Sequence, residues 1–223
     1  MSLDRDREIR EIELASLNTA PRLPIIFLVD NSFSMIKKYK DNKKRIEMVN
    51  EELRNFVEDF ANNPYACDGL EITLILFGDT AQTVYKFEPV QNIDAKSIDI
   101  KAEGGNTCLG EALELAIKLL DERLQFYKDT SLHYYKPNIV IMTDGEATDI
   151  AKLEKMSEVI QQRQNTKQAL KIFSLAIGDE GAEKTLSAYH LQDEELKGLD
   201  IVSFSQYLSR SMTSQSKTHY DGE

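Results

Sequence analysis

The sequence predicts an α/β fold built around an open, mostly parallel sheet. Strand-like segments alternate along the chain with longer helical segments, which is typical of strand–helix–strand units. The apolar residues of the first strand-like segment follow one another without polar interruption, as in a strand that is buried on both faces. No internal repeat or interdomain linker is present, so the 223 residues indicate one main domain.

The first strand is predicted at 23–30, where the sequence is apolar up to its final aspartate and Pro24 lies near the start. The first helix is predicted at 45–61, because apolar residues recur there at steps of three and four. The later elements follow in this order: strand 70–77, antiparallel edge strand 81–87, helix 109–124, strand 138–143, helix 150–164, strand 170–177, helix 183–190, strand 201–204 and helix 206–212.

The two ends of the chain depart from this pattern. Residues 1–21 form a charged arm, and its apolar residues lie near one helical face: Ile9, Ile12, Leu14 and Leu17. A short amphipathic helix that docks on the body or on a partner, and a frayed arm, both remain open. Residues 22–212 are expected to form the domain, and residues 213–223 a disordered polar tail.

Composition excludes several classes of protein. With 41% hydrophobic and 29% charged residues, the chain is ordinary for a globular protein and unlike a disordered one. Its net charge of −11 argues against general binding to nucleic acid or to anionic membranes. Two cysteines, Cys67 and Cys108, are too few for a disulfide scaffold or a structural zinc site.

We expect a cytoplasmic protein. The longest apolar run, residues 25–29, is far too short for a membrane span. The first residues have no apolar core and no cleavage site, so they do not resemble a signal peptide. A signal peptide lost from the start of the chain would undo this expectation.

Oxygen-bearing side chains follow the predicted strands. The first strand ends in Asp30 and continues with Ser32 and Ser34, in a D-x-S-x-S pattern. Thr107 ends the Gly-Gly-Asn-Thr loop before the long helix, and strand 138–143 runs directly into Asp144. Because open α/β sheets bind ligands at the carboxyl ends of their strands, we predict that these five residues converge.

Such a set of ligands suits a hard divalent cation. Carboxylate and hydroxyl oxygens favour Mg²⁺ or Mn²⁺ over Zn²⁺. Two carboxylates only cancel the double charge of the ion, and the hydroxyls add no charge. The bound ion would therefore still attract one further anion, such as a carboxylate of a partner.

Each of these residues also has an ordinary structural explanation. Ser32 and Ser34 are suited to capping the next helix, and Asp144-Gly145 to a simple turn. The D-x-S-x-S pattern alone is weak evidence. Its occurrence after the most buried strand, together with matching residues at two other strand ends, favours the metal site.

Three stretches resemble the von Willebrand factor A (vWA) domain family, in the form that carries a metal-ion-dependent adhesion site (MIDAS). They are RLPIIFLVDNSFSM from Arg22, GEAL from Gly110 and MTDGE from Met142. The resemblance extends over about residues 22–212. More narrowly, the chain resembles the bacterial cytoplasmic branch associated with tellurium resistance, which is linked to protein kinases and phosphatases of stress responses.

The resemblance implies a doubly wound, Rossmann-like sheet with helices on both faces and one antiparallel edge strand. It implies that Ser32, Ser34 and Thr107 contact Mg²⁺ or Mn²⁺ directly, and that Asp30 and Asp144 do so largely through water. A ligand carboxylate or water would fill the sixth position.

Two residues depart from the family pattern, which commonly has glycine at both positions. Phe33 places a large aromatic side chain beside the site, where it would narrow the rim or form part of a recognition surface. Asn106 precedes the threonine, and asparagine tolerates left-handed backbone better than most residues. Cys108, next to Thr107, is interpreted as a small buried filler in preference to a reactive thiol.

The leading hypothesis is a metal-dependent protein-binding adaptor, not an enzyme, in a bacterial stress or tellurium-resistance system. Its partner would present an Asp or Glu to the metal, and a kinase or phosphatase of the same system is a candidate. We expect the net negative charge to slow such encounters at low salt, so the shape around Phe33 and Glu146 would set selectivity.

Two alternatives remain. One is a metal-dependent phosphatase-type hydrolase with Asp30 as nucleophile, although such enzymes usually place a second acid where this chain has Ser32. The three histidines also lack partners for a catalytic triad, and no glycine-rich phosphate-binding loop is present. The other alternative is a vWA scaffold that binds no metal.

Overall fold

The structure is a computed structural model that describes residues 18–39, 42–63, 68–164, 166, 169–177, 180–191 and 206. Residues 1–17 of the expected arm at 1–21, the strand at 201–204, nearly all of the helix at 206–212 and the tail at 213–223 lie outside these residues. Within the described part of the chain, no helix has the length and apolar character needed to cross a membrane.

The core of the domain is a five-stranded sheet in the order β3-β2-β1-β4-β5. Its strands are β1 (Leu23–Asp30), β2 (Leu70–Phe77), β3 (Ala81–Pro89), β4 (Asn138–Thr143) and β5 (Lys171–Ala176). Strands β2, β1, β4 and β5 run parallel, and β3 pairs antiparallel with β2 at the edge. This confirms the predicted mixed α/β sheet with one antiparallel edge strand.

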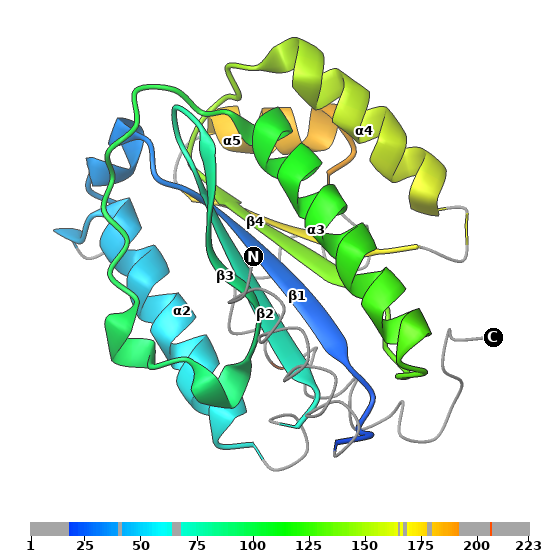
Figure 1. Ribbon diagram of the computed structural model, residues 1–223. Helices are drawn as coiled ribbons and strands as arrows, with labels where there is room; N and C mark the ends of the chain where they lie inside the picture. Colours follow the sequence, from blue (N-terminus) through cyan, green and yellow to red (C-terminus); the bar gives the residue numbers. More distant parts are fainter. Residues whose placement is uncertain are drawn as a thin grey trace, which may run out of the picture.

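Helices cover both faces of the sheet (Figure 1). Helix α2 (Arg45–Ala61) lies on one face with the short 3-10 helices η3 (Val90–Asn92) and η4 (Ala95–Ser97). The other face packs against α3 (Leu109–Asp129), α4 (Ile150–Gln164) and α5 (Glu180–Ala188). A further 3-10 helix, η1 (Phe33–Ile36), follows β1 and contacts α2.

The uninterrupted apolar run of β1 follows from this layering. Ile25, Phe27 and Val29 belong to the core under α2, while Ile26 and Leu28 belong to the core under α3 and α4. All of β1 is buried, because alternate side chains enter two different cores. The central strand therefore carries its final carboxylate, that of Asp30, to a fixed place at the edge of the sheet.

Several predicted boundaries differ from those observed; helix α3, for example, continues to Asp129, past the predicted end at 124. Strand β3 continues past the predicted end at 87 to Pro89. Phe87 has a left-handed backbone (φ 46°), and the pairing with β2 shifts register nearby. This irregularity breaks the alternation on which the prediction depended. Helix α5 begins at Glu180, three residues before the predicted start, and includes Gly181, a poor helix former that does not fit a helical pattern.

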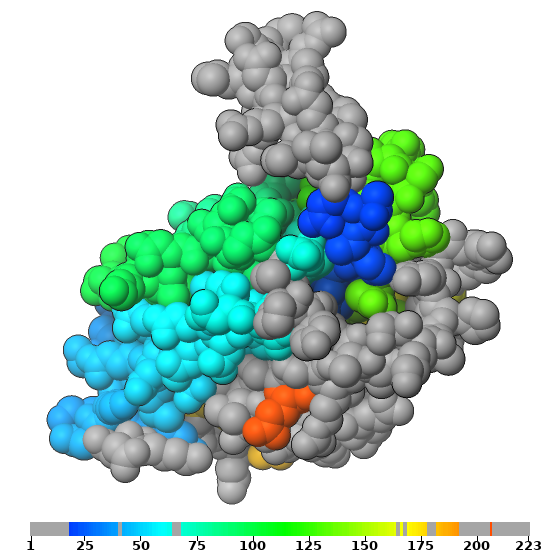
Figure 2. Space-filling model, turned by 90° about the horizontal axis from the view of Figure 1, so that it is seen from below, coloured from blue at the N-terminus to red at the C-terminus, as the bar shows by residue number. Residues whose placement is uncertain are grey.

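A buried ionic cluster lies at the amino ends of the parallel strands, on the opposite side of the sheet from Asp30 at the carboxyl end of β1. Glu71 of β2 accepts two hydrogen bonds from Arg123 of α3, at 2.8 and 2.7 Å, and one from Tyr127 at 2.5 Å. Arg22 lies nearby, 3.7 Å from the same carboxylate. In Figure 2 the first described residues, in blue, lie on this side of the molecule beside green atoms of α3 and the segment after it, where Arg22 pairs with Tyr134.

Candidate metal site

The topology brings the predicted ligands to one edge of the sheet. Asp30 ends β1, and Asp144 directly follows β4, which is the parallel neighbour of β1. Ser34 lies in η1, immediately after β1, and Thr107 lies just before α3. Since parallel neighbours end on the same side, the two carboxylates come from strands that terminate next to each other.

A chain of hydrogen bonds joins the first and last of these segments. Ser34 Oγ donates to Asp144 Oδ1 at 2.5 Å, and Ser32 Oγ lies 2.9 Å from Ser34 Oγ. The carboxylate of Asp30 accepts from the Ser32 backbone N–H at 2.9 Å and from Thr143 Oγ1 at 2.6 Å. Residues 110 positions apart in sequence thus share one polar cluster.

Thr107 approaches the same cluster from the third segment. A Cβ placed on Gly145 would lie 3.8 Å from Thr107 Oγ1 and 4.0 Å from Ser34 Oγ, so both hydroxyls lie close to the bend after Asp144. Backbone hydrogen bonding fixes this position, because Thr107 accepts from the Thr148 N–H at 3.0 Å. The structure therefore brings together all five residues that the sequence predicted: Asp30, Ser32, Ser34, Thr107 and Asp144.

The two carboxylates are almost completely shielded from water. Asp30 is 0% exposed and Asp144 is 4% exposed. Burial raises the pKa of the Asp30 carboxyl, the hydrogen bonds from Thr143 and Ser32 oppose that rise, and the negative charge of Asp144 adds to it. A divalent cation between these groups would remove the electrostatic cost of keeping Asp30 ionised.

The donor set fits a hard cation. All five side chains offer oxygen, and the described residues contain no cluster of three or more His, Cys, Asp or Glu side chains that could hold a metal. Zinc also accepts carboxylate oxygen, although its structural sites in proteins are built mostly from nitrogen and sulfur ligands. The arrangement fits Mg²⁺ or Mn²⁺ with two carboxylates and three hydroxyls.

Arg45 is a member of this site that the sequence analysis did not identify. Its Nη1 lies 2.5 Å from Asp144 Oδ2, and the ion pair is buried, since Arg45 is only 3% exposed. The helical pattern contains a signal for it. Arg45 is in phase with the apolar stripe through Val49 and Leu53, so the chain places a charge on a face that turns inward.

The helix-cap explanation for the serines is not what the structure shows. Ser32 precedes η1 without making a side-chain cap, and the hydroxyls of Ser32 and Ser34 face each other. Phe33, between them, is 60% exposed, so it does not close the site and forms part of the outer surface.

The loop around Asn106 is held by hydrogen bonds and not by the left-handed backbone that was expected at Asn106. Asn106 does not adopt a left-handed backbone; its side chain donates to Asp79 Oδ1 at 2.7 Å, and so do the N–H groups of Gly105 and Asn106. Gly104 is required for close approach, because a Cβ there would lie 2.8 Å from Gly78 Cα. These contacts fix the loop that presents Thr107.

Cys108, next to Thr107, behaves as a partly buried structural side chain. Its thiol donates to the Asp79 carbonyl at 3.4 Å. Burial raises the thiol pKa, and the negative charges of Asp149, Glu111 and Asp79 add to the effect. Both conditions disfavour the reactive thiolate.

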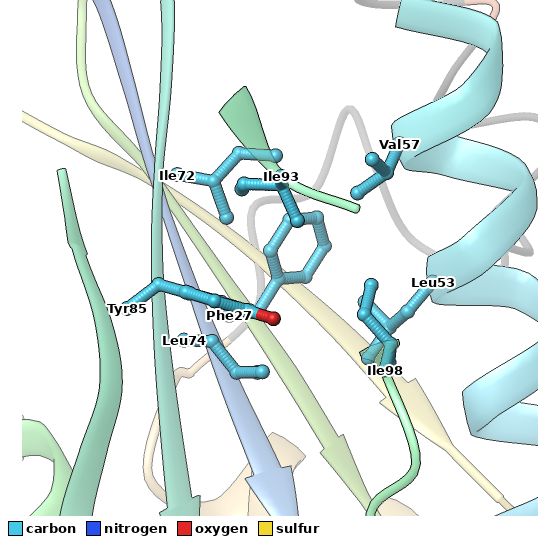
Figure 3. A pocket seen from close by; sticks show the side chains of 8 residues that line it. All are labelled: Phe27, Leu53, Val57, Ile72, Leu74, Tyr85, Ile93 and Ile98. Carbon is cyan, nitrogen blue, oxygen red and sulfur yellow. The ribbon is translucent and has the colours of Figure 1, made fainter. Parts of the chain in front are cut away.

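A small cavity elsewhere in the domain is not a second site. It lies between the sheet and α2, and eight side chains line it, among them Phe27, Val57 and Ile93 (Figure 3). The polar group among them is the Tyr85 hydroxyl, which already contacts Ser97 at 3.0 Å. The cavity therefore offers no chemistry for a polar ligand and is an imperfection of core packing.

Comparison with known proteins agrees with this fold. A model of the von Willebrand factor type A domain matches residues 25–147. A search of curated proteins found no match.

Solved structures share the architecture at low identity. Proximal thread matrix protein 1 from the mussel byssus is 18% identical, with a TM-score of 0.56 over 88% of this chain and 45% of its own. Another structure of that protein, described as having a zinc-occupied MIDAS motif, gives a TM-score of 0.55. The PilB minor pilin from Streptococcus sanguinis is 12% identical, with a TM-score of 0.57 over 87% of this chain and 61% of its own. At these identities the likeness shows the fold.

Proposed function

Because the chain belongs to the von Willebrand factor type A domain family, we propose that it is a divalent-metal-dependent protein-binding domain. In this proposal Asp30, Ser32, Ser34, Thr107 and Asp144 hold the ion, and a carboxylate of a partner protein completes its coordination. The ion supplies a localised positive charge that binds and orients that carboxylate. The domain itself supplies no catalytic group and acts as an adaptor.

One observation carries the proposal. Two separate segments bring the hydroxyls of Ser32, Ser34 and Thr107 to Asp144 at the carboxyl end of β4, and the carboxylates of Asp30 and Asp144 are both buried. A domain that bound nothing at this edge would gain stability from apolar residues in place of two buried carboxylates. Support also comes from the matrix protein with a similar fold, which is described with zinc in its MIDAS motif.

We propose Mg²⁺ or Mn²⁺ as the resident ion, on the strength of the oxygen-only ligands. Thermal unfolding after EDTA treatment, with and without millimolar Mg²⁺ or Mn²⁺, tests this. A free metal concentration 100 times the dissociation constant should stabilise the domain by about 2.7 kcal/mol. The stabilisation should vanish in Asp30→Ala and persist in Asp94→Ala, a control that removes the exposed carboxylate capping η4. No shift in the wild-type protein at millimolar metal would refute the metal site.

The proposed partner presents an exposed Asp or Glu, and nucleic acid and membranes are not proposed as ligands. We propose a kinase or phosphatase of a bacterial stress or tellurium-resistance system as the partner, in the cytoplasm. The resemblance of three sequence stretches to that branch of the family supports this assignment. Replacing the partner's acidic residue should abolish binding in pull-down assays, and undiminished binding would contradict coordination by the metal.

The buried ion pair of Arg45 with Asp144 favours a second candidate, a vWA scaffold that binds no metal. The guanidinium already neutralises one of the two carboxylates, at 2.5 Å. The unfolding experiment separates the two candidates, because the scaffold would show no metal-dependent shift. A phosphatase role for Asp30 would instead require metal-dependent release of phosphate from a generic phosphoester, lost in Asp30→Ala.

A further inference from the structure

A strongly basic loop borders the candidate metal site. Residues 33–45 carry a net charge of +5, although the whole chain carries −11, so the rest of the chain carries −16. The described basic residues of this segment are Lys37, Lys38, Lys43, Lys44 and Arg45, and none of its described residues is acidic. The term "basic loop" below refers to the described residues 33–39 and 42–45.

Both ends of the basic loop are fixed to the site. It begins with Phe33 and Ser34, and Ser34 donates to Asp144; it ends with Arg45, which pairs with the same carboxylate. Its two arms run antiparallel, since Arg45 N–H donates to the Lys37 carbonyl at 3.0 Å and Tyr39 N–H to the Lys43 carbonyl at 2.9 Å. The loop therefore lies where β1 ends and α2 begins, beside the candidate ligands (Figure 1).

The basic loop also concentrates exposed apolar side chains. Phe33 is 60% exposed, Ile36 is 43% exposed and Tyr39 is 39% exposed. The described residues contain only two other large hydrophobic side chains with comparable exposure, Val84 and Ile150. Aromatic and apolar groups beside positive charges are typical of a surface that binds another protein.

The lysines of the loop fall into two pairs. Lys43 and Lys44 form exposed ion pairs with Glu51 and Glu47, at 2.6 and 3.5 Å. Lys37 and Lys38 are exposed, and neither has a described carboxylate within ion-pair distance. The pKa of Glu47 is lowered mainly by the hydrogen bond from the Lys44 N–H, and the charge of Lys38 adds to that effect from farther away. The ammonium groups of Lys37 and Lys38 are the positive charges most readily offered to a partner.

We propose that the basic loop extends the metal site into a docking surface for an acidic segment of a partner protein. One carboxylate of that segment would bind the ion, an apolar side chain would contact Phe33 and Ile36, and further Asp or Glu residues would face Lys37 and Lys38. The metal contact rests on the proposed function above, whereas the contribution of the loop rests on its own charge.

Charge complementarity selects this occupant. With a divalent ion bound, the charges of the ion and Arg45 exceed those of Asp30 and Asp144, so the site and loop are positive together. The net charge of −16 on the rest of the chain repels long polyanions such as nucleic acid. A short acidic segment, however, can stay within the positive region. Binding should therefore strengthen at low salt, the opposite of what the net charge of the whole chain suggests.

Selection from a random dodecapeptide library displayed on phage tests the proposal. The 223-residue chain is used as bait with Mg²⁺ and, separately, with EDTA. Its variants are Lys37→Glu/Lys38→Glu and the control Lys118→Glu/Lys128→Glu, which makes the same charge change at exposed lysines of α3. A cooperative urea unfolding transition in EDTA, close to that of the wild type, confirms that each variant is folded and does not depend on metal binding.

We expect the wild type and the control to enrich acidic peptides that contain an apolar residue, and the Lys37/Lys38 variant to lose that enrichment. An enriched peptide should bind this variant at least tenfold more weakly, and should bind the wild type more weakly as NaCl is raised.

Acidic enrichment that survives in the Lys37/Lys38 variant but is lost in EDTA would overturn the role of the loop and leave the metal function standing. Enrichment that is lost with the lysines but survives EDTA would support the loop and count against the metal function. No acidic enrichment in the wild type would overturn the proposed docking surface.

Discussion

The guanidinium of Arg45 lies 2.5 Å from the carboxylate of Asp144, and both side chains are buried. The pair joins the first residue of α2 to the residue that follows β4, across 99 positions of sequence. It places a fixed positive charge beside two buried carboxylates at a site proposed to hold a divalent cation. Arg45 and a bound ion therefore compete for the negative charge of Asp144.

Arg45→Met should destabilise the metal-free protein and increase the stabilisation that Mg²⁺ gives on binding. Removing one partner of a buried ion pair costs about 3–5 kcal/mol, because the remaining charge stays buried without compensation. A divalent ion would supply that compensation, so the stabilisation by Mg²⁺ should exceed that of the wild type. Urea unfolding in EDTA and in Mg²⁺ measures both quantities.

Arg54→Met is the matched control for this experiment. Arg54 lies on the same helix and donates to the Ile98 carbonyl at 2.8 Å, away from the candidate ligands. Its loss should lower stability equally with and without metal. A Mg²⁺ response of Arg45→Met no larger than that of wild type would show that the guanidinium does not compete with the ion.

Asp30→Asn should stabilise the metal-free domain increasingly as pH rises. Burial raises the folded-state pKa of Asp30 above its ordinary value of 3.8, so the protonated form favours folding. This contribution to stability is fully present below the unfolded-state pKa and is lost as pH rises through the folded-state pKa. Asparagine cannot ionise and keeps an oxygen for the Ser32 N–H, so the variant escapes that loss.

Unfolding free energies measured in EDTA from pH 4 to 7 test this expectation. The stability of the variant relative to the wild type should increase over that range. Addition of Mg²⁺ at pH 7 should stabilise the wild type and not the variant, reducing or reversing the difference. A pH-independent difference in EDTA would mean that the ionised carboxylate costs the fold nothing.

Local sequence pattern was sufficient to predict most of the fold. The strand 23–30 and the helix 45–61 coincide with β1 and α2, because unbroken apolar runs and three-to-four spacing report directly on burial. The gathering of Asp30 with Asp144 was predictable too, since one ends a predicted parallel strand and the other directly follows one, and the carboxyl ends of such strands share one edge of the sheet.

Contacts between distant charged residues were not predictable in the same way. Arg45 pairs with Asp144, and Arg123 pairs with Glu71, only when helix and sheet have packed together. The local spacing of residues in the sequence does not predict such pairs. The irregularity at Phe87 was missed for a related reason, because it depends on its hydrogen bond to Thr73 of the neighbouring strand at 3.0 Å. Sequence pattern indicates which faces turn inward, and tertiary packing decides which polar groups meet there.

Tyr127→Phe should destabilise the domain by about 1–3 kcal/mol without altering metal binding. The Tyr127 hydroxyl donates to the buried carboxylate of Glu71 at 2.5 Å, and its loss leaves that carboxylate one donor short. Tyr85→Phe is the control, because its hydroxyl contacts Ser97 in an exposed position and should matter by less than about 0.5 kcal/mol. Equal costs for the two variants in urea unfolding would refute a special role for the buried cluster.

Gly110→Ala should destabilise the domain, although alanine normally favours a helix by about 1 kcal/mol over glycine. Gly110 lies in the first turn of α3, and a Cβ there would meet the Leu153 nitrogen at 2.5 Å and the Lys152 carbonyl carbon at 2.8 Å. These are backbone atoms of α4, so one helix must move. The displacement would also disturb Asp149, whose carboxylate accepts from the Gly110 and Glu111 N–H groups at 3.0 and 2.8 Å. We expect a cost of about 1–3 kcal/mol in urea unfolding.

Gly105→Ala, whose Cβ would lie 3.6 Å from Asp79, should stay within about 0.5 kcal/mol of wild type. A stabilised Gly110→Ala would show that α3 and α4 can separate freely, and that Asp149 does not hold the start of α3 next to Thr107.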